Sequence, residues 1–335
     1  MTKRTLNILV SIIVAGLFIW LAIRNIDLGE LWAQIRGISL FWIPGFVMIV
    51  LMSHFFRAER WRLLLKQEQR VIPRSSLFAG VMLGYFVNTV VPRLGEVSRP
   101  VYVAKKHNVS SSNLLGTIVI ERIIDVCSML LLFMFIAIYI SRDFEILEQI
   151  FGTQEWSALT YLIIPGFIIA VIAGMWAFYR ILAWYDKQNE ISSPLLQKVV
   201  GAGRSFGEGM VSVRHVDNWP AFLVLTAGIW LGYIFMTYIP FYMMELQAQF
   251  GLSLADAVVL TMVSSIGVSI PTPGGIGSYH LLIQQSMNLL YEVPLVTALT
   301  YATIAHAASI LTVMLTTPLA LWWDKYYTLK TTGDR

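Results

Sequence analysis

The chain has 335 residues, of which 57% are hydrophobic and only 13% are charged, and its mean hydropathy is +0.67. This composition excludes a water-soluble globular domain, because such domains carry about 25% charged residues. The net charge of +4 is small, and the single cysteine, Cys127, excludes an intramolecular disulfide bond. We therefore expect an all-α polytopic membrane protein that forms a single transmembrane domain over residues 1–335.

Six apolar stretches are long enough to cross a hydrocarbon core about 30 Å thick as helices. These predicted full spans are residues 5–23, 39–56, 108–141, 156–179, 218–244 and 293–323. We expect the first to be a span and not a cleaved signal peptide, because no small-residue cleavage site closes it. A hydrophilic loop, residues 180–217, follows the fourth span.

Two further apolar segments are interrupted by proline and glycine. Residues 75–99 contain Pro-Arg-Leu-Gly at 92–95, the first break, and residues 253–292 contain Pro-Thr-Pro-Gly-Gly-Ile-Gly at 271–277, the second break. Proline removes a backbone donor and glycine disfavours helix, so neither segment can be one continuous membrane helix. We predict that both are re-entrant segments, because non-helical backbone at membrane depth needs protein or a water-filled cavity around it.

The two interrupted segments occupy matching positions in two halves, residues 1–150 and 156–335. This arrangement favours inverted repeats, and paired broken helices indicate where a transporter binds its substrate.

The distribution of basic residues predicts the topology. If both interrupted segments return to the side they left, the connections on one side hold twenty Lys and Arg residues, among them Arg57 and Arg60, and the other side holds three. The positive-inside rule then places both termini and the 180–217 loop in the cytoplasm. We expect a multi-pass protein of the bacterial inner membrane.

Polar side chains gather around the first break. They are Asn88, Arg93, Glu96 and Arg99. The guanidinium groups of Arg93 and Arg99 are suited to a phosphate, and Glu96 could pair with either or take a cation. The alternative is a cytoplasmic loop whose arginines meet anionic lipid headgroups.

The third span carries three charged residues, Glu121, Arg122 and Asp125. Glu121 and Asp125 are four residues apart and share a helix face, and Arg122 can reach Asp125. Two interpretations stay open: a polar lining that couples protons, or a structural ion-pair network.

The second break is a candidate anion site, because a helix that starts near Ser278 directs its first N–H groups toward the break. His280 adds a titratable donor. The alternative is a structural helix break, and His54 and His306 are interpreted as structural. The candidate substrate-binding residues here are Pro273, Gly274, Gly275, Gly277, Ser278 and His280.

No phosphate-binding loop, nucleotide fingerprint or metal-ligand spacing is present, so the sequence predicts no enzyme, cofactor, metal site or nucleic-acid partner.

Three blocks of residues together resemble one known family. The first block holds Gly84, Tyr85, Asn88, Pro92, Gly95, Glu96 and Arg99, the second Glu121, Arg122 and Asp125, and the third the motif at 271–277. They are similar to the lysylphosphatidylglycerol synthase transmembrane-region family, a flippase-like domain, over nearly the whole chain. The resemblance implies six or more spans with re-entrant elements and a possible homodimer. In multidomain members it implies movement of an aminoacylated phospholipid that a separate domain makes.

Two departures from the family pattern shape the expected substrate. We expect no synthase domain after residue 335, so lipid aminoacylation is not expected from this chain. His280 stands where many relatives carry an acidic residue, which makes an anionic or glycan-linked lipid at least as good a candidate as a lysyl lipid.

The resulting hypothesis is a flippase for a phospholipid or a polyprenyl-phosphate-linked lipid. Arg93 and Arg99 would contact the phosphate, and Glu121 or Asp125 would couple protons. The alternatives are a small-solute or ion carrier, or a non-transporting membrane partner in glycolipid or cell-envelope assembly.

Overall fold

The computed structural model describes residues 3–65, 72–140 and 212–333, together with residues 201, 203, 205 and 207. Every regular element in these ranges is a helix. The predicted fourth span and most of the 180–217 loop lie outside the described residues.

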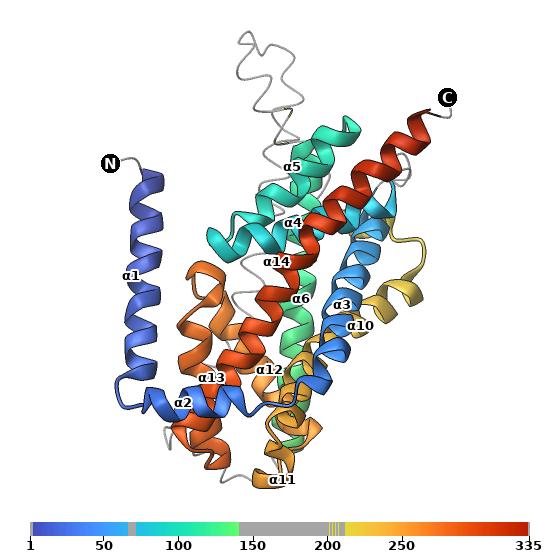
Figure 1. The fold of residues 1–335 in the computed structure, drawn as a ribbon. Coiled ribbons are helices and arrows are strands. Elements are labelled where there is room, and N and C mark those ends of the chain that lie inside the picture. Colours follow the sequence, from blue (N-terminus) through green and yellow to red (C-terminus); the bar gives the residue numbers. More distant parts are fainter. Residues whose placement is uncertain are drawn as a thin grey trace, which may run out of the picture. The chain divides into compact units, whose positions relative to one another are not determined.

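The chain divides into two compact units, each described here by itself. Unit 1 comprises residues 1–63, 67–107 and 216–335, and unit 2 comprises residues 64–66 and 108–215. Unit 1 contains α1 (Lys3–Ile23), α2 (Leu28–Arg36), η1 (Leu40–Trp42), α3 (Ile43–Leu64), α4 (Arg74–Val90), α5 (Gly95–His107), α10 (Trp219–Met243), α11 (Leu246–Phe250), α12 (Leu254–Ser269), η4 (Pro273–Gly275), α13 (Ser278–Tyr291) and α14 (Leu295–Gly333). Unit 2 contains α6 (Ser111–Ile140) and η3 (Ser212–His215). Both predicted breaks therefore fall in unit 1 (Figure 1).

Three helical segments of the described ranges are long and apolar enough to cross a membrane: Leu40–Leu64, Trp219–Met243 and Leu295–Tyr327. A fourth span is possible if α1 and α2 are counted together, although the chain bends by 90° between them. The Asp27 carboxylate caps α2 by accepting from the backbone N–H groups of Gly29 and Glu30. These findings support an integral membrane protein with three or four spans among the described residues.

The second span is longer than the sequence predicts. It continues without interruption to Leu64, because no glycine or proline follows Gly45 in α3. Arg57 and Arg60 are fully buried within it. The predicted span ended at Phe56, so the sequence placed both arginines in the connection after it, whereas the structure places them within the helix. The connection expected after the first break is also helical, as α5, and Arg99 is buried there.

Each break joins two helices that pack against one another. At the first break, the Gly95 N–H donates to Asn88 Oδ1 at 2.7 Å, and a Cβ on Gly84 would lie 3.1 Å from the Gly95 carbonyl oxygen. At the second break, a Cβ on Gly267 would lie 3.0 Å from Tyr279 Cα. Glycine permits both close approaches, so each interrupted segment forms a helical hairpin.

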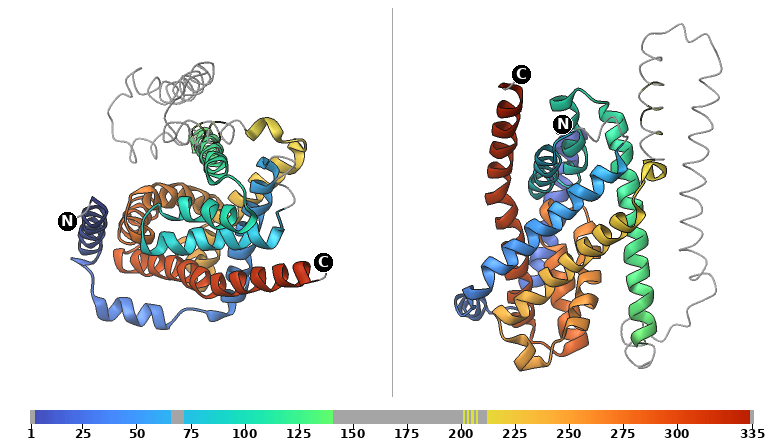
Figure 2. Two further views of the ribbon diagram at one scale, coloured as in Figure 1. Left: turned by 90° about the horizontal axis from the view of Figure 1, so that it is seen from above. Right: turned by 90° about the vertical axis from the view of Figure 1, so that its right-hand side faces the viewer.

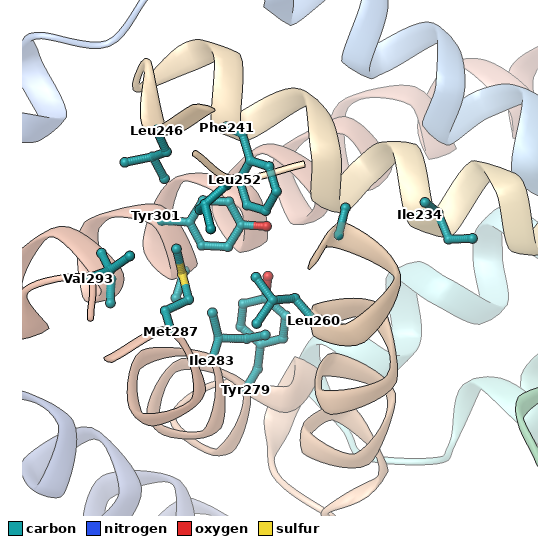
Figure 3. Packing of buried hydrophobic residues seen from close by; sticks show 13 residues of the cluster. Ile234, Phe241, Leu246, Leu252, Leu260, Tyr279, Ile283, Met287, Val293 and Tyr301 are labelled. Atoms are coloured by element: carbon teal, nitrogen blue, oxygen red, sulfur yellow. The ribbon is translucent and has the colours of Figure 1, made fainter. Parts of the chain in front are cut away.

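A hydrophobic cluster from α10 to α14 holds the second hairpin in place (Figure 3). Phe241 of α10 and Tyr301 of α14 pack with ring centroids 5.3 Å apart, and Leu260 and Ile283 bring in the two arms of the hairpin. The Tyr301 hydroxyl donates to the Thr237 carbonyl at 2.6 Å, so this buried phenol has a partner.

The two hairpins are linked through α14. Thr317 of α14 donates to the Met82 carbonyl of α4 at 3.3 Å, and α14 also packs along α13. Figure 2 shows α14 in red alongside the α4–α5 hairpin, with α1 at the edge of the unit. α1 packs on α13 and η4, so it covers the second break.

Candidate functional site

The two breaks meet inside unit 1. The Arg93 guanidinium, from the first break, donates through Nη2 to the Ser269 carbonyl at the end of α12, at 3.1 Å. A Cβ on Gly274, in the second break, would lie 3.4 Å from Thr89 Cα. Two segments 176 residues apart in sequence are thus in direct contact at the points where their helices stop.

Arg93 has an unusual backbone conformation at this junction. Its φ is +61°, in the left-handed region that residues with a side chain seldom adopt. Its side chain is exposed, and the Ser269 carbonyl accepts one of its five N–H donors. The carbonyl ends of α12 carry partial negative charge, which favours a cation here. Arg93 therefore joins the two hairpins while keeping donors available to an anion.

The second break is held together by its own hydroxyl groups. Ser278 is fully buried and donates to the Gly267 carbonyl at 2.8 Å, and the hydroxyls of Ser278 and Thr272 are 3.0 Å apart. Pro273 begins the short helix η4 between the two arms. The Ser278 side chain thus stabilises the break from within, which gives this predicted binding residue a structural contact.

Two histidines lie beside the second break. His280 Nδ1 accepts from the Gly277 N–H at 3.4 Å, and the His280 and His306 rings are 5.1 Å apart. His306 also contacts the Tyr279 ring at 4.5 Å, and its Cε1 would be 3.6 Å from a Cβ on Gly275. The sequence singled out His280 but not His306, because nothing local shows that α14 brings His306 to the break.

The residues predicted to form a site at the first break contact different parts of the protein. The Arg99 guanidinium carbon lies 4.0 Å from the centroid of the Trp61 ring of α3, whereas Arg93 faces α12. Asn88 binds the Gly95 backbone and closes the hairpin. Glu96 lies in the first turn of α5. Arg93 is therefore the cation that the structure brings to the second break.

A partly buried polar chain, which the sequence did not predict, connects α3, α4 and α10. Arg57 Nη2 donates to the Tyr233 hydroxyl at 2.7 Å, which is 3.1 Å from the Tyr85 hydroxyl. The His54 ring stacks on Tyr85 with centroids 4.1 Å apart. The sequence does contain one sign that Arg57 belongs to the helix: no glycine or proline interrupts the chain between Gly45 and Arg57.

A second buried polar cluster surrounds Asp324 of α14. Asp324 Oδ1 accepts from Ser75 and Ser76 at 3.1 and 2.6 Å, and Oδ2 accepts from the Tyr102 hydroxyl and Lys106 Nζ, both at 2.6 Å. Burial, followed by the hydrogen bond to Asp324, raises the pKa of Tyr102. This cluster binds the open ends of α4 and α5 to α14.

The three charged residues of the third span lie in unit 2, on α6. Arg122 Nη1 is 3.6 Å from Asp125 Oδ2, so the predicted ion pair forms. Glu121 is 1% exposed.

Membrane-spanning helices and two helical hairpins that meet at their breaks define an integral membrane protein. The chain belongs to the family described as the lysylphosphatidylglycerol synthase TM region, whose family model matches residues 8–316. The match includes both breaks and α6, and it confirms the resemblance seen in the sequence.

Two curated proteins of Methanocaldococcus jannaschii are similar to this chain. UPF0104 membrane protein MJ1078 is 27% identical over 231 residues, which cover 68% of this chain and 90% of that protein. UPF0104 membrane protein MJ1595 is 24% identical over 273 residues, which cover 76% of each. No solved structure matches this chain significantly.

Proposed function

We propose that this protein moves a phosphate-bearing lipid between the two leaflets of the membrane, with the headgroup passing the junction of the two breaks. The contact between Arg93 and the Ser269 carbonyl carries the proposal, because it joins two interrupted helices at their ends. Discontinuous helices that meet in this way form the substrate sites of secondary transporters. The proposal assigns transport, and no catalytic step, to this chain.

Arg93 is the residue best placed to bind a phosphate. Its guanidinium is exposed, and a phosphate oxygen would replace the Ser269 carbonyl as acceptor, with a stronger charge-assisted hydrogen bond. Binding of a phosphate would then release the Ser269 carbonyl from Arg93.

The charges around the second break favour an anionic headgroup over a cationic one. Residues 257–291 contain no Asp, Glu, Lys or Arg, so a lysyl group would find no carboxylate on this segment. The phosphate is the part of a phospholipid or a polyprenyl-phosphate-linked lipid that Arg93 would recognise. The family name, which includes a phospholipid, supports a lipid as cargo.

We place both termini in the cytoplasm. Even without the three buried arginines, Arg57, Arg60 and Arg99, seventeen of the twenty Lys and Arg residues remain on the terminal side, against three opposite. The asymmetry still satisfies the positive-inside rule. An inner-membrane location is part of the proposal.

The test is a leaflet-exchange assay in proteoliposomes that contain a fluorescent phospholipid or polyprenyl-phosphate lipid. Arg93→Gly removes the guanidinium at a position where glycine tolerates the backbone conformation. Transport should slow by about tenfold or more, because a hydrogen bond to a charged group contributes about 1.5–3 kcal/mol. Lys105→Ala, which removes an exposed positive charge from α5, is the matched control and should leave the rate unchanged.

Two results would count against the proposal. Equal rates for wild type, Arg93→Gly and protein-free liposomes would exclude lipid movement of these cargoes. Arg93-dependent uptake of a soluble phosphate compound, without lipid movement, would identify a small-solute carrier.

A further inference from the structure

His280 occupies a capping position at the second break. It is the third residue of α13, and its Nδ1 accepts from the backbone N–H of Gly277, the residue before the helix. In a capping box, the side chain of the third helical residue makes this contact, and it is normally Glu or Gln. Here the capping acceptor is an imidazole nitrogen, which can be protonated.

Protonation and capping exclude one another at His280. An imidazole nitrogen accepts a hydrogen bond through its lone pair, so the neutral ring that caps Gly277 carries its proton on Nε2. A second proton must bind Nδ1. The Nδ1–H would then face the Gly277 N–H, and the capping contact would be lost.

His306 makes the position a two-imidazole site. His306 is 8% exposed, and its ring lies 5.1 Å from the His280 ring, with 36° between their planes. Two positive charges this close repel strongly where water is scarce, so the pair takes up one proton and not two.

The other groups around the pair bring no neutralising carboxylate. Tyr279 of α13 contacts both rings, and Arg93 is the cation at the neighbouring first break. α1 has no acidic residue between Lys3 and Ile23, α12 has only Asp256 in its first turn, and the first acidic residue of α14 is Asp324. The described helices that pack on α13 therefore supply no negative charge to balance a bound proton. That charge must come from a group outside these helices.

We propose that His280 and His306 together bind one proton from water, and that this proton detaches the His280 ring from the Gly277 N–H and loosens the second break. The switch stands apart from the proposed function. If the proposed function holds, an anionic headgroup at the junction supplies the missing negative charge, and proton and lipid phosphate bind cooperatively.

The chain has five histidines, so their ring signals can be assigned one at a time with His→Gln variants. The first experiment follows these signals by NMR in lipid nanodiscs from about pH 8 down to about pH 3, because burial of both rings disfavours the charged form. The His280 and His306 signals should respond together, with one shared midpoint, and His306→Gln should move the midpoint of His280. Independent midpoints, or no response of His280 over this range, would overturn the proposal.

The second experiment measures hydrogen exchange of the peptide that spans the second break, corrected for the intrinsic effect of pH. In the wild type, exchange at Gly277 should rise as the pH falls. His280→Gln keeps a capping acceptor that cannot be protonated, so its exchange should stay slow at every pH. His280→Ala has no cap, so its exchange should be fast at every pH. The same pH dependence in His280→Gln as in the wild type would refute the switch.

Transport by the same variants separates the two proposals. Lipid movement that depends on pH in the wild type and not in His280→Gln would join the switch to the proposed function. A switch that is intact by NMR and exchange, with no lipid movement at any pH, would refute the proposed function and leave the proton site standing.

Discussion

Lys106 Nζ lies 2.6 Å from Asp324 Oδ2, so an ion pair joins the end of α5 to α14. The Asp324 side chain is fully buried, and that of Lys106 is 19% exposed. Lys106 also donates to the Asp324 carbonyl at 3.1 Å. This pair, with the hydroxyls around it, fixes the open end of the first hairpin, while Arg93 links the opposite end to the second.

Asp324→Ala should strongly destabilise the protein. Removing one partner of a buried ion pair costs about 3–5 kcal/mol, because the other charge is left without compensation. Thermal unfolding in detergent should show a lower transition temperature, whereas Glu292→Gln, at an exposed position, should not change it. Equal transition temperatures for both variants would show that the pair contributes little.

Stability should fall in mild acid because of His107. Its Nε2 is 2.9 Å from the Ser76 hydroxyl, and burial, then the Lys106 charge, lower its pKa from 6.5, while Asp324 opposes them. The unfolded chain therefore binds the proton more readily. The contribution of His107 is fully present above about pH 6.5 and is lost as the pH falls further.

His107→Gln is the matching variant for this effect. Between about pH 7.5 and about pH 5.5, its transition temperature should fall less than that of the wild type, because glutamine does not titrate in this range. Identical pH profiles would show that other groups cause the acid sensitivity.

Gly95→Ala should disrupt the first hairpin. A Cβ on Gly95 would lie 2.7 Å from the Asn88 side chain, and it would also clash with the Gly84 carbonyl oxygen. Overpacking of this kind costs about 1–3 kcal/mol. Gly45→Ala in α3 has no atom within 4 Å of the added carbon and should be neutral or slightly stabilising. Unfolding of the two variants in denaturant measures the difference, and equal stability would contradict the close hairpin contact.

Tyr233→Phe should destabilise the protein, because Tyr233 lies in the middle of the partly buried polar chain. The substitution removes the hydroxyl that Arg57 and Tyr85 contact, and the loss of a buried hydrogen-bond partner costs about 1–3 kcal/mol. Tyr326→Phe, at a residue that is 53% exposed, is the control. The measurement is the free energy of unfolding of each variant. An unchanged value for Tyr233→Phe would show that these hydrogen bonds do not stabilise the protein.

The sequence predicted the features that depend on local chemistry. Pro92 and the glycines of the second break interrupt helices wherever they occur, so both hairpins and the family could be recognised without a structure. The spans now seen as α10 and α14 were predicted for the same reason, because an apolar run of sufficient length identifies a membrane helix.

The roles of charged residues were harder to predict. Arg57 and Arg60 follow an apolar stretch and resemble a basic loop, yet both are buried. Asp324 sits among tryptophans, tyrosines and lysines near the C-terminus and resembles a surface residue, yet it is fully buried against α4 and α5. The sequence does not show which distant residue will supply the partner that makes such burial possible.

The sequence by itself determined that this is an all-helical membrane protein of a particular family, with two helix breaks. Hydropathy and the interruption of a helix by proline or glycine are local properties of the chain, so they can be recognised without the tertiary structure. Only the tertiary structure decided that Arg93 reaches Ser269, that His306 stands beside His280, and that Asp324 binds the first hairpin. Each of these contacts joins separate helices, so it depends on how the helices pack and not on the local chain.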